Sequence, residues 1–265
     1  MKKTLLVFAL FSAAIGSAQA ADMPLKAPVV VAPFTWTGVY LGINAGYGNN
    51  TSDGSSYCTT ATGVASGTGC WPSAPSGISP SGGFVGGQIG ANYQVGLFVF
   101  GIESDIQVAN ISGSNTFTTP CCIPGFTGAN SVWARSQNMD WFGTVRGRLG
   151  LAIWDRTLIY GTGGLMYAEE AVNSNLGSPQ PTVPAVVNYQ GTSSGTHSGW
   201  VGGGGLEYAF TKNLSAKVEG LYYNLGSENV TAFALNVPTN HFTDTTSFTY
   251  KGAMVRLGAN LKFGP

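Results

Sequence analysis

Residues 36–48 read WTGVYLGINAGYG, a stretch in which apolar side chains alternate with glycine, tyrosine and asparagine. An extended chain turns successive side chains to opposite faces, so the alternation gives this stretch two different faces. One face carries Val39, Leu41, Ile43, Ala45 and Tyr47. The other face is polar and rich in glycine. The pattern predicts a β-strand with a lipid face and a polar interior face, as in a transmembrane β-barrel.

The same period-two pattern occurs seven more times, although for residues 157–168 it does not decide which face points inward. The expected strands span 83–94, 98–107, 139–152, 157–168, 196–210, 214–224 and 248–263. Short connections at 95–97, 153–156 and 211–213 alternate with long ones at 49–82, 108–138, 169–195 and 225–247. We therefore predict an all-β fold: an eight-stranded antiparallel up-and-down transmembrane β-barrel with four long external loops and periplasmic termini.

The composition supports a membrane location. Charged residues make up only 9% of the chain, whereas a water-soluble domain usually carries about 25%. No apolar stretch of about 18 or more residues follows the N-terminal segment, which excludes a helical membrane protein. A sheet in hydrocarbon must close on itself because unpaired backbone groups at its edges are costly there. The composition thus favours a closed barrel.

The N-terminus has the features of a secretory signal. Lys2 and Lys3 precede an apolar run, and small residues lead up to Ala20. We expect a signal peptide over 1–20, a Pro-rich periplasmic tether over 21–35 and the outer-membrane barrel domain over 36–265. Without the signal the chain carries 10 basic and 12 acidic residues, a net charge of −2, and nucleic acid is not an expected partner.

Nine charged side chains fall on the predicted interior faces. They are Glu103, Asp105, Arg146, Arg148, Glu207, Lys217, Glu219, Arg256 and Lys262. These four acids and five bases nearly neutralise one another, and the bore of an eight-stranded barrel is only wide enough for side chains to fill it. We expect a paired polar network that plugs the interior, because isolated buried charges are costly. A small diffusion pore is the alternative.

Aromatic residues lie near the expected strand ends. They include Trp36, Tyr47, Trp141, Tyr167, Trp200, Tyr208, Phe210 and Phe263. Such rings gather at the two membrane interfaces of outer-membrane barrels. We therefore expect the outer surface to contact outer-membrane lipid and lipopolysaccharide.

All four cysteines fall in expected external loops, Cys58 and Cys70 in the first and Cys121 and Cys122 in the second. Export into an oxidising compartment favours disulfides. Four cysteines allow three pairings. We favour a Cys58–Cys70 bridge, but Cys121 and Cys122 can form a vicinal bridge or can each bond to a first-loop cysteine. No CxxC motif or flanking histidine indicates a metal site.

The sequence shows no catalytic constellation, and we predict a protein that is not an enzyme and needs no cofactor. His197 and Ser198 could serve as base and nucleophile, but consecutive strand residues point to opposite faces and cannot form the activating hydrogen bond. The glycine run 202–205 precedes neither a Lys-Ser/Thr pair nor a helix, as a phosphate-binding loop requires.

Four segments together resemble the small outer-membrane immunogenic protein family of alphaproteobacteria. They are WTGVYLGINAGYG at 36–48, FGTVRGRLG at 142–150, GLYYNLG at 220–226 and VRLGANLKF at 255–263. The resemblance implies an eight-stranded barrel of the OmpA type and an abundant surface protein, with haemin binding or pore formation described for some members. It also implies that the last strand, ending in Phe263 before Gly264 and Pro265, is read by the barrel-assembly machinery.

These observations predict a structural and surface-exposed envelope protein with a plugged interior. One alternative is a porin-like diffusion pore. The other is a surface protein whose loops bind haemin or a host ligand, with His241 or loop tyrosines as iron ligands.

Overall fold

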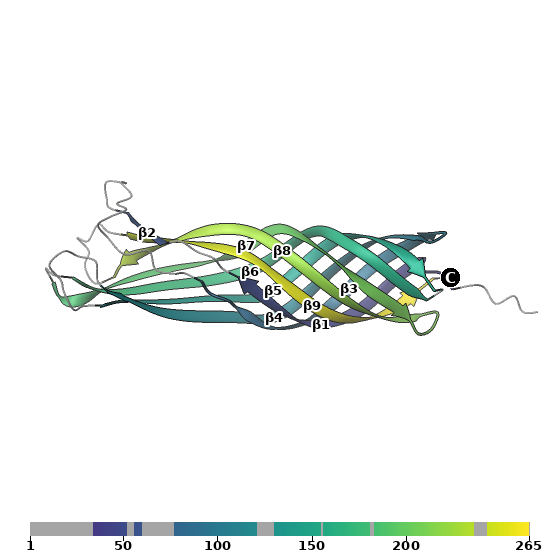
Figure 1. The fold of residues 1–265 in the computed structure, drawn as a ribbon, viewed down its shortest axis with the longest axis horizontal. Helices are drawn as coiled ribbons and strands as arrows, with labels where there is room; N and C mark the ends of the chain where they lie inside the picture. The colour runs from purple at the N-terminus through teal and green to yellow at the C-terminus, as the bar shows by residue number, and fades with distance from the viewer. Residues whose placement is uncertain are drawn as a thin grey trace, which may run out of the picture. The chain divides into compact units, whose positions relative to one another are not determined.

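The computed structural model describes residues 34–51, 56–59, 77–120, 130–154, 156–180, 183–235 and 243–264. The expected signal peptide and most of the expected tether lie outside these residues. Within them, eight antiparallel strands close into a ring, because β1 pairs with both β3 and β9 (Figure 1). The ring strands are β1 (Gly38–Thr51), β3 (Ser81–Val95), β4 (Phe98–Pro120), β5 (Asn130–Ile153), β6 (Thr157–Gln180), β7 (Val183–Ala209), β8 (Leu214–Ala234) and β9 (Thr243–Phe263). The predicted eight-stranded up-and-down barrel is confirmed.

The three short turns lie together at one end of the barrel, close to the end of β9 (Figure 1). They connect β3 to β4, β5 to β6 and β7 to β8, as the sequence predicts. In the second turn Trp154 adopts a positive φ of 49° and is largely exposed. The other four connections, from β1 to β3, β4 to β5, β6 to β7 and β8 to β9, belong to the opposite end.

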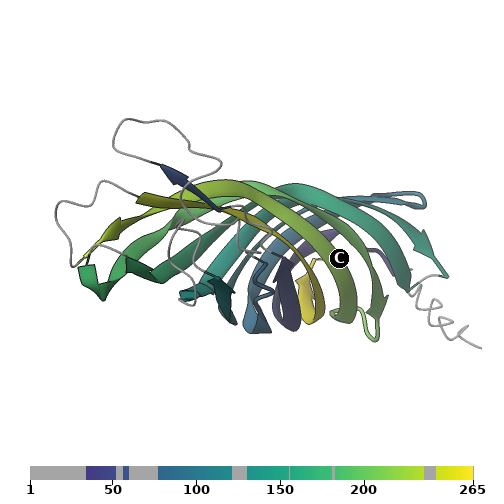
Figure 2. The same ribbon diagram turned by 60° about the vertical axis from the view of Figure 1, so that its left-hand side comes forward.

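The stretches predicted as long loops contain much more strand than expected. β4 and β6 continue to Pro120 and Gln180, and the adjoining strands extend with them. A short additional strand, β2 (Ser56–Thr59), pairs with the outer end of β9 (Figure 2). These extensions are rich in Ser, Thr and Asn and lack a continuous apolar outer face, so the pattern expected of a membrane strand could not reveal them, although polar strands pair their backbones equally well. Their interior side carries buried apolar residues, among them Trp133, Leu176 and Tyr189.

The described strands have an apolar outer face over about ten residues each, the length needed to cross a membrane. This apolar band includes Val39, Leu41, Ile43, Ile89, Ile102, Val145, Leu149, Leu165, Leu206, Val218, Val255 and Leu257, all exposed. β6 follows the same rule: Leu158, Tyr160 and Met166 are buried inward, whereas Ile159 and Leu165 are exposed. In the described part of the chain, no helix is long and apolar enough to cross a membrane.

Most of the predicted interfacial aromatics do lie on the outer face. At the end of the band away from the turns, the ring centroids of Trp200 and Tyr222 are 5.6 Å apart; near the turns, those of Tyr208 and Phe210 are 5.1 Å apart. Trp36 is the exception. Its side chain is buried inside the turn end of the barrel, in a cluster with Val99, Leu158 and Tyr160, and Phe34 packs against this cluster.

Candidate functional site

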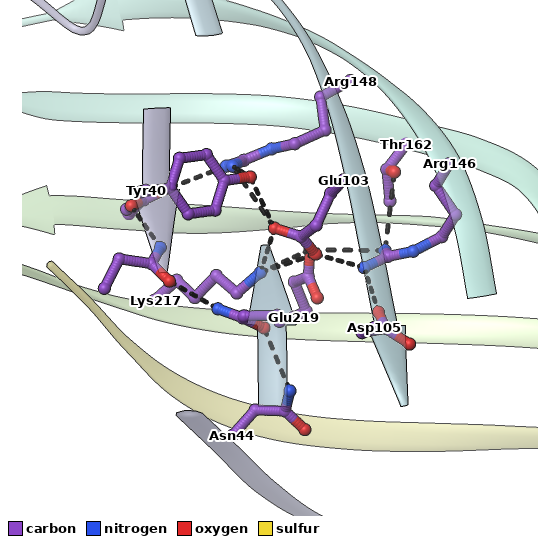
Figure 3. Close-up of polar contacts among 12 residues, drawn as sticks. Tyr40, Asn44, Glu103, Asp105, Arg146, Arg148, Thr162, Lys217 and Glu219 are labelled. Carbon is purple, nitrogen blue, oxygen red and sulfur yellow. Dashed lines mark hydrogen bonds and ion pairs between the residues drawn. The ribbon is translucent and has the colours of Figure 1, made fainter. Parts of the chain in front are cut away.

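Eight charged side chains meet inside the membrane-spanning half of the barrel, and we call this group the charged layer (Figure 3). Its members are Glu103 and Asp105 from β4, Arg146 and Arg148 from β5, Glu207 from β7, Lys217 and Glu219 from β8, and Arg256 from β9. All eight are buried. Their positions follow from the strand period, which places alternate residues of each strand in the bore.

Glu103 is the hub of the charged layer (Figure 3). Its two carboxylate oxygens lie 2.8 and 2.6 Å from Nζ of Lys217, and Oε1 also lies 3.0 Å from Nη2 of Arg256. Arg146 contacts the same oxygen. The Tyr40 hydroxyl donates to Oε2 at 2.7 Å. One carboxylate thus holds together side chains from four other strands.

The remaining charges extend the layer across the bore. Oδ2 of Asp105 accepts from Arg256 at 2.8 Å and from Arg146 at 3.1 Å. Glu219 pairs with Arg256 and lies 3.4 Å from Nη1 of Arg146. Each of these charges therefore has at least two partners of opposite sign.

Arg148 joins the layer to its turn-side neighbours. Its Nη2 donates to Glu207 at 2.7 Å, and its Nη1 donates to the Tyr40 hydroxyl at 2.8 Å. The guanidinium also lies 3.9 Å from the centroid of the Tyr160 ring, within the range of a cation–π contact. Tyr40 and Tyr160 are partners that the charge pattern of the sequence did not reveal.

Four acids and four bases leave the charged layer without net charge, so no counter-ion is needed to fill it. The ninth residue of the predicted network, Lys262, lies apart from it near the turns. Its ammonium donates to the carbonyl of Thr35 and lies 4.7 Å from the centroid of the Phe34 ring. Lys262 therefore helps to hold the chain that enters β1 instead of pairing with the buried acids.

A second group of side chains fills the bore on the side of the charged layer that faces away from the short turns, and we call it the apolar layer. It includes Phe84, Met139, Phe142, Met166, Leu221 and Met254, all buried. The Phe84 and Phe142 rings meet edge to face at 5.1 Å. Gly46 is required at this level, since a Cβ there would lie 2.5 Å from the Phe84 ring and 2.9 Å from Arg256. The sequence analysis assigned a polar interior and missed this layer.

The turn end of the bore is closed by the chain that precedes β1. Phe34 and Trp36 pack edge to face at 5.1 Å, and Trp36 lies against Val99, Leu158 and Tyr160. The Trp36 backbone N–H donates to Oε1 of Gln94 at 2.8 Å, which ties this segment to the end of β3.

Beyond the apolar layer, the strand extensions enclose a different set of polar residues. Glu170 is 1% exposed, and its Oε2 accepts from Gln137 at 3.1 Å. The outward-facing residues beside it, Asp140 and Glu169, are exposed carboxylates, so this level lies outside the apolar band. Burial raises the pKa of the Glu170 carboxyl to about 8. Further out, burial raises the pKa of Asp244 to about 6 despite the nearby Arg135.

The other sequence-predicted residues take no part in the filled bore. Cys58 lies in β2 in register with Asp244, whereas Cys70, Cys121, Cys122 and His241 lie outside the described residues. On β7, His197 faces the interior of the barrel and Ser198 is exposed on the outer face, because consecutive strand residues point to opposite faces. Among the residues that the structure describes, no three His, Cys, Asp or Glu side chains gather as metal ligands would.

A closed antiparallel ring with an apolar outer band and a bore filled by side chains defines a small outer-membrane β-barrel. Comparison with known proteins agrees: the chain belongs to the outer membrane protein beta-barrel domain family, whose model matches residues 6–263. It is a protein of the cell outer membrane.

Relatives from alphaproteobacteria narrow the assignment. The chain is 34% identical over 257 residues to a 31 kDa outer-membrane immunogenic protein of Brucella melitensis, covering 93% of this chain and 94% of that protein. It is 28% identical to a 22 kDa outer membrane protein of Rhizobium leguminosarum, covering 67% and 66% of the two chains. The names of these relatives describe outer-membrane proteins, one of them immunogenic, and mention no enzymatic activity.

Among solved structures, the outer membrane protease OmpT of Escherichia coli is similar in outline. The TM-score is 0.43 at 10% identity, with 87% of this chain and 98% of that one covered.

Proposed function

We propose that the protein is a non-conducting envelope protein, whose plugged barrel anchors a surface-exposed set of strands and loops in the outer membrane. The observation that carries this proposal is the filling of the bore by two successive layers, one charged and one apolar, with Trp36 closing the turn end. Water or a solute moving along the axis would have to displace all three. An eight-stranded barrel has no spare width for such a path.

The proposal also assigns the two ends of the barrel. Short turns face the periplasm in outer-membrane barrels and long connections face outward, so the strand extensions and β2 would be displayed at the cell surface. The apolar band and its flanking aromatic rings support contact with lipid and lipopolysaccharide. Phe263, the last residue of β9, pairs in register with Val39 of β1 and is half exposed, a position consistent with recognition by the assembly machinery.

Planar-bilayer recording tests the proposal directly. The protein, purified from membranes and verified as folded by the heat-dependent gel shift of β-barrels, is expected to show no conductance steps above background. A porin reconstituted in the same lipid provides the positive control. Discrete steps from folded protein would contradict the proposal and favour the diffusion pore.

Haemin binding is kept as a proposal from the family resemblance alone, with His241 as the candidate ligand. A haemin titration followed in the Soret band compares the parent with His241→Ala. Identical spectra would remove His241 from consideration, and no spectral change in the parent would remove haemin.

A further inference from the structure

The turn between β5 and β6 holds a strained backbone position. Trp154 has a φ of 49°, and among the residues that the structure describes it is the one residue other than glycine with a positive φ. Tight turns between strands normally place Gly, Asn or Asp at such a position, because a larger side chain is strained there. Trp154 is also 84% exposed, so packing inside the barrel does not explain why a tryptophan stands here. Strain without a packing reason points to a role for the ring outside the barrel.

Hydrogen bonds to both neighbouring turns hold this turn in place. The N–H of Ala152 donates to the carbonyl of Leu97, between β3 and β4, at 2.8 Å. The N–H of Ala209 donates to the carbonyl of Arg156 at 2.9 Å, and the Arg156 guanidinium donates to the carbonyl of Phe210 at 3.1 Å. The three short turns therefore form one connected rim, at the right-hand end of the barrel in Figure 1. We call it the turn rim, and it comprises residues 95–97, 153, 154, 156 and 210–213.

The turn rim continues the apolar band with exposed apolar side chains. Leu97 and Phe210 are exposed like Trp154, and the Phe210 ring meets the ring of Tyr208 on the outer face of β7. Tryptophan is favoured at the boundary between hydrocarbon and lipid headgroups, because its ring is apolar and its N–H needs a polar partner. An exposed Trp154 at the end of the band therefore lies at the level of the headgroups.

Two cations of the turn rim have no anionic partner in the part of the chain that the structure describes. Arg156 and Lys212 are both exposed, and neither forms an ion pair there. The contact between Arg156 and Phe210 places the guanidinium beside the turn that carries Lys212. A guanidinium has five N–H donors, and the Phe210 carbonyl accepts from one of its nitrogens. By sequence the three turns contain these two cations and one acid, Asp155, so their net charge is 2 − 1 = +1.

We propose that the turn rim binds an anionic phospholipid, whose phosphate accepts hydrogen bonds from Arg156 and Lys212 and whose acyl chains lie along the apolar band beside Trp154. A guanidinium can donate two parallel N–H bonds to a phosphate, and an ammonium adds a second positive charge. A zwitterionic lipid carries its own cation beside its phosphate, so the rim should prefer phosphatidylglycerol to phosphatidylcholine. This site is more specific than the general lipid contact of the apolar band, and it does not depend on a closed bore.

Native mass spectrometry of the full protein in detergent tests the site by titration with phosphatidylglycerol or with phosphatidylcholine of the same acyl chains. Phosphatidylglycerol should bind more tightly. Arg156→Gln and Lys212→Gln should each lower this preference by about fivefold, the effect of one cation at an anionic headgroup. Lys212→Arg keeps the charge and should keep the preference. Lys251→Gln is the matched control, because Lys251 pairs in register with Asn224 at the end of the band away from the turns.

Trp154→Gly tests the ring separately. Glycine adopts a positive φ without strain, so the variant should fold, as the heat-dependent gel shift can verify, yet bind both lipids more weakly. Glycerol 3-phosphate carries a phosphate without acyl chains and should not displace phosphatidylglycerol at equal concentration. Four results would each overturn the proposal: equal affinity for the two lipids, an equal loss of preference in Lys251→Gln, unchanged lipid binding in folded Trp154→Gly, or full displacement by glycerol 3-phosphate.

Discussion

Replacing Glu103 by Gln is the sharpest test of the charged layer. The substitution keeps the shape of the side chain but removes the charge that faces Lys217 at 2.6 Å and Arg256 at 3.0 Å. All three side chains have 0% exposure, so water cannot replace the lost partner. Breaking a buried ion pair by removing one partner costs about 3–5 kcal/mol. We expect a loss of that size in the free energy of unfolding.

The second half of the test restores the balance of charge. Lys217→Met alone should also destabilise the barrel, because it leaves Glu103 and Glu219 with one cation fewer. The double variant Glu103→Gln/Lys217→Met is again neutral, so its loss should be clearly smaller than the sum of the two single losses. Asp140→Asn removes an exposed charge and is the control, with an expected change within about 0.5 kcal/mol.

Urea unfolding of the barrel in lipid vesicles, followed by tryptophan fluorescence, measures these differences. A loss below about 1 kcal/mol for Glu103→Gln would show that the layer tolerates an uncompensated cation. Strict additivity in the double variant would show that Glu103 and Lys217 are not coupled. Either result would refute the reasoning that neutrality of the bore holds the barrel closed.

Three further predictions use the same unfolding assay or the bilayer recording. Burial raises the pKa of Glu170 to about 8 and of Asp244 to about 6, both above their values in the unfolded chain. As pH falls, these carboxyl groups become protonated in the folded state first, and the cost of keeping a buried group ionised disappears. Stability should therefore rise from pH 9 to pH 5, and a Glu170→Gln variant with an equally steep profile would contradict this. Trp36→Ala should lower the free energy of unfolding by about 3–5 kcal/mol, because it leaves a cavity at the turn end. The variant should still show no conductance steps in bilayers, because the charged and apolar layers remain. Conductance steps would show that these two layers do not close the bore without Trp36. The Tyr167 ring packs against Gly143, and Tyr167→Ala removes this contact. The free energy of unfolding should fall by about 1 kcal/mol or more, and an unchanged unfolding midpoint would show that the contact does not stabilise the barrel.

The membrane-spanning part of the fold was predictable because lipid imposes a strict period of two. The alternation is clearest in β5, where Arg146 and Arg148 are buried and Leu149 is exposed. The sequence predicts the inward direction of both arginines. β6 was ambiguous because its sequence GTGGLM at 161–166 offers little contrast between faces. Only the register with β5 and β7 decides that Met166 points inward.

The same rule fails where its physical cause is absent. Outside the membrane no lipid selects apolar residues for the outer face, so the extensions of β4 to β9 lack the apolar-out pattern, and buried apolar residues such as Trp133 and Leu176 point inward instead. Inside the bore, the rule separates lipid-facing from interior positions but does not say what the interior holds. Phe84 and Phe142 are interior residues of apolar type, and their contact depends on the distance across the ring between β3 and β5, which one sequence cannot supply.

The order of the layers explains why the charged layer can be stable at all. Ion pairs in a narrow bore weaken when water reaches them from either end, since water screens them and competes for their hydrogen bonds. The apolar layer excludes water from the side away from the turns, and Trp36 with Phe34 excludes it from the turn side. An axial path for solutes would therefore remove the condition under which eight buried charges remain paired.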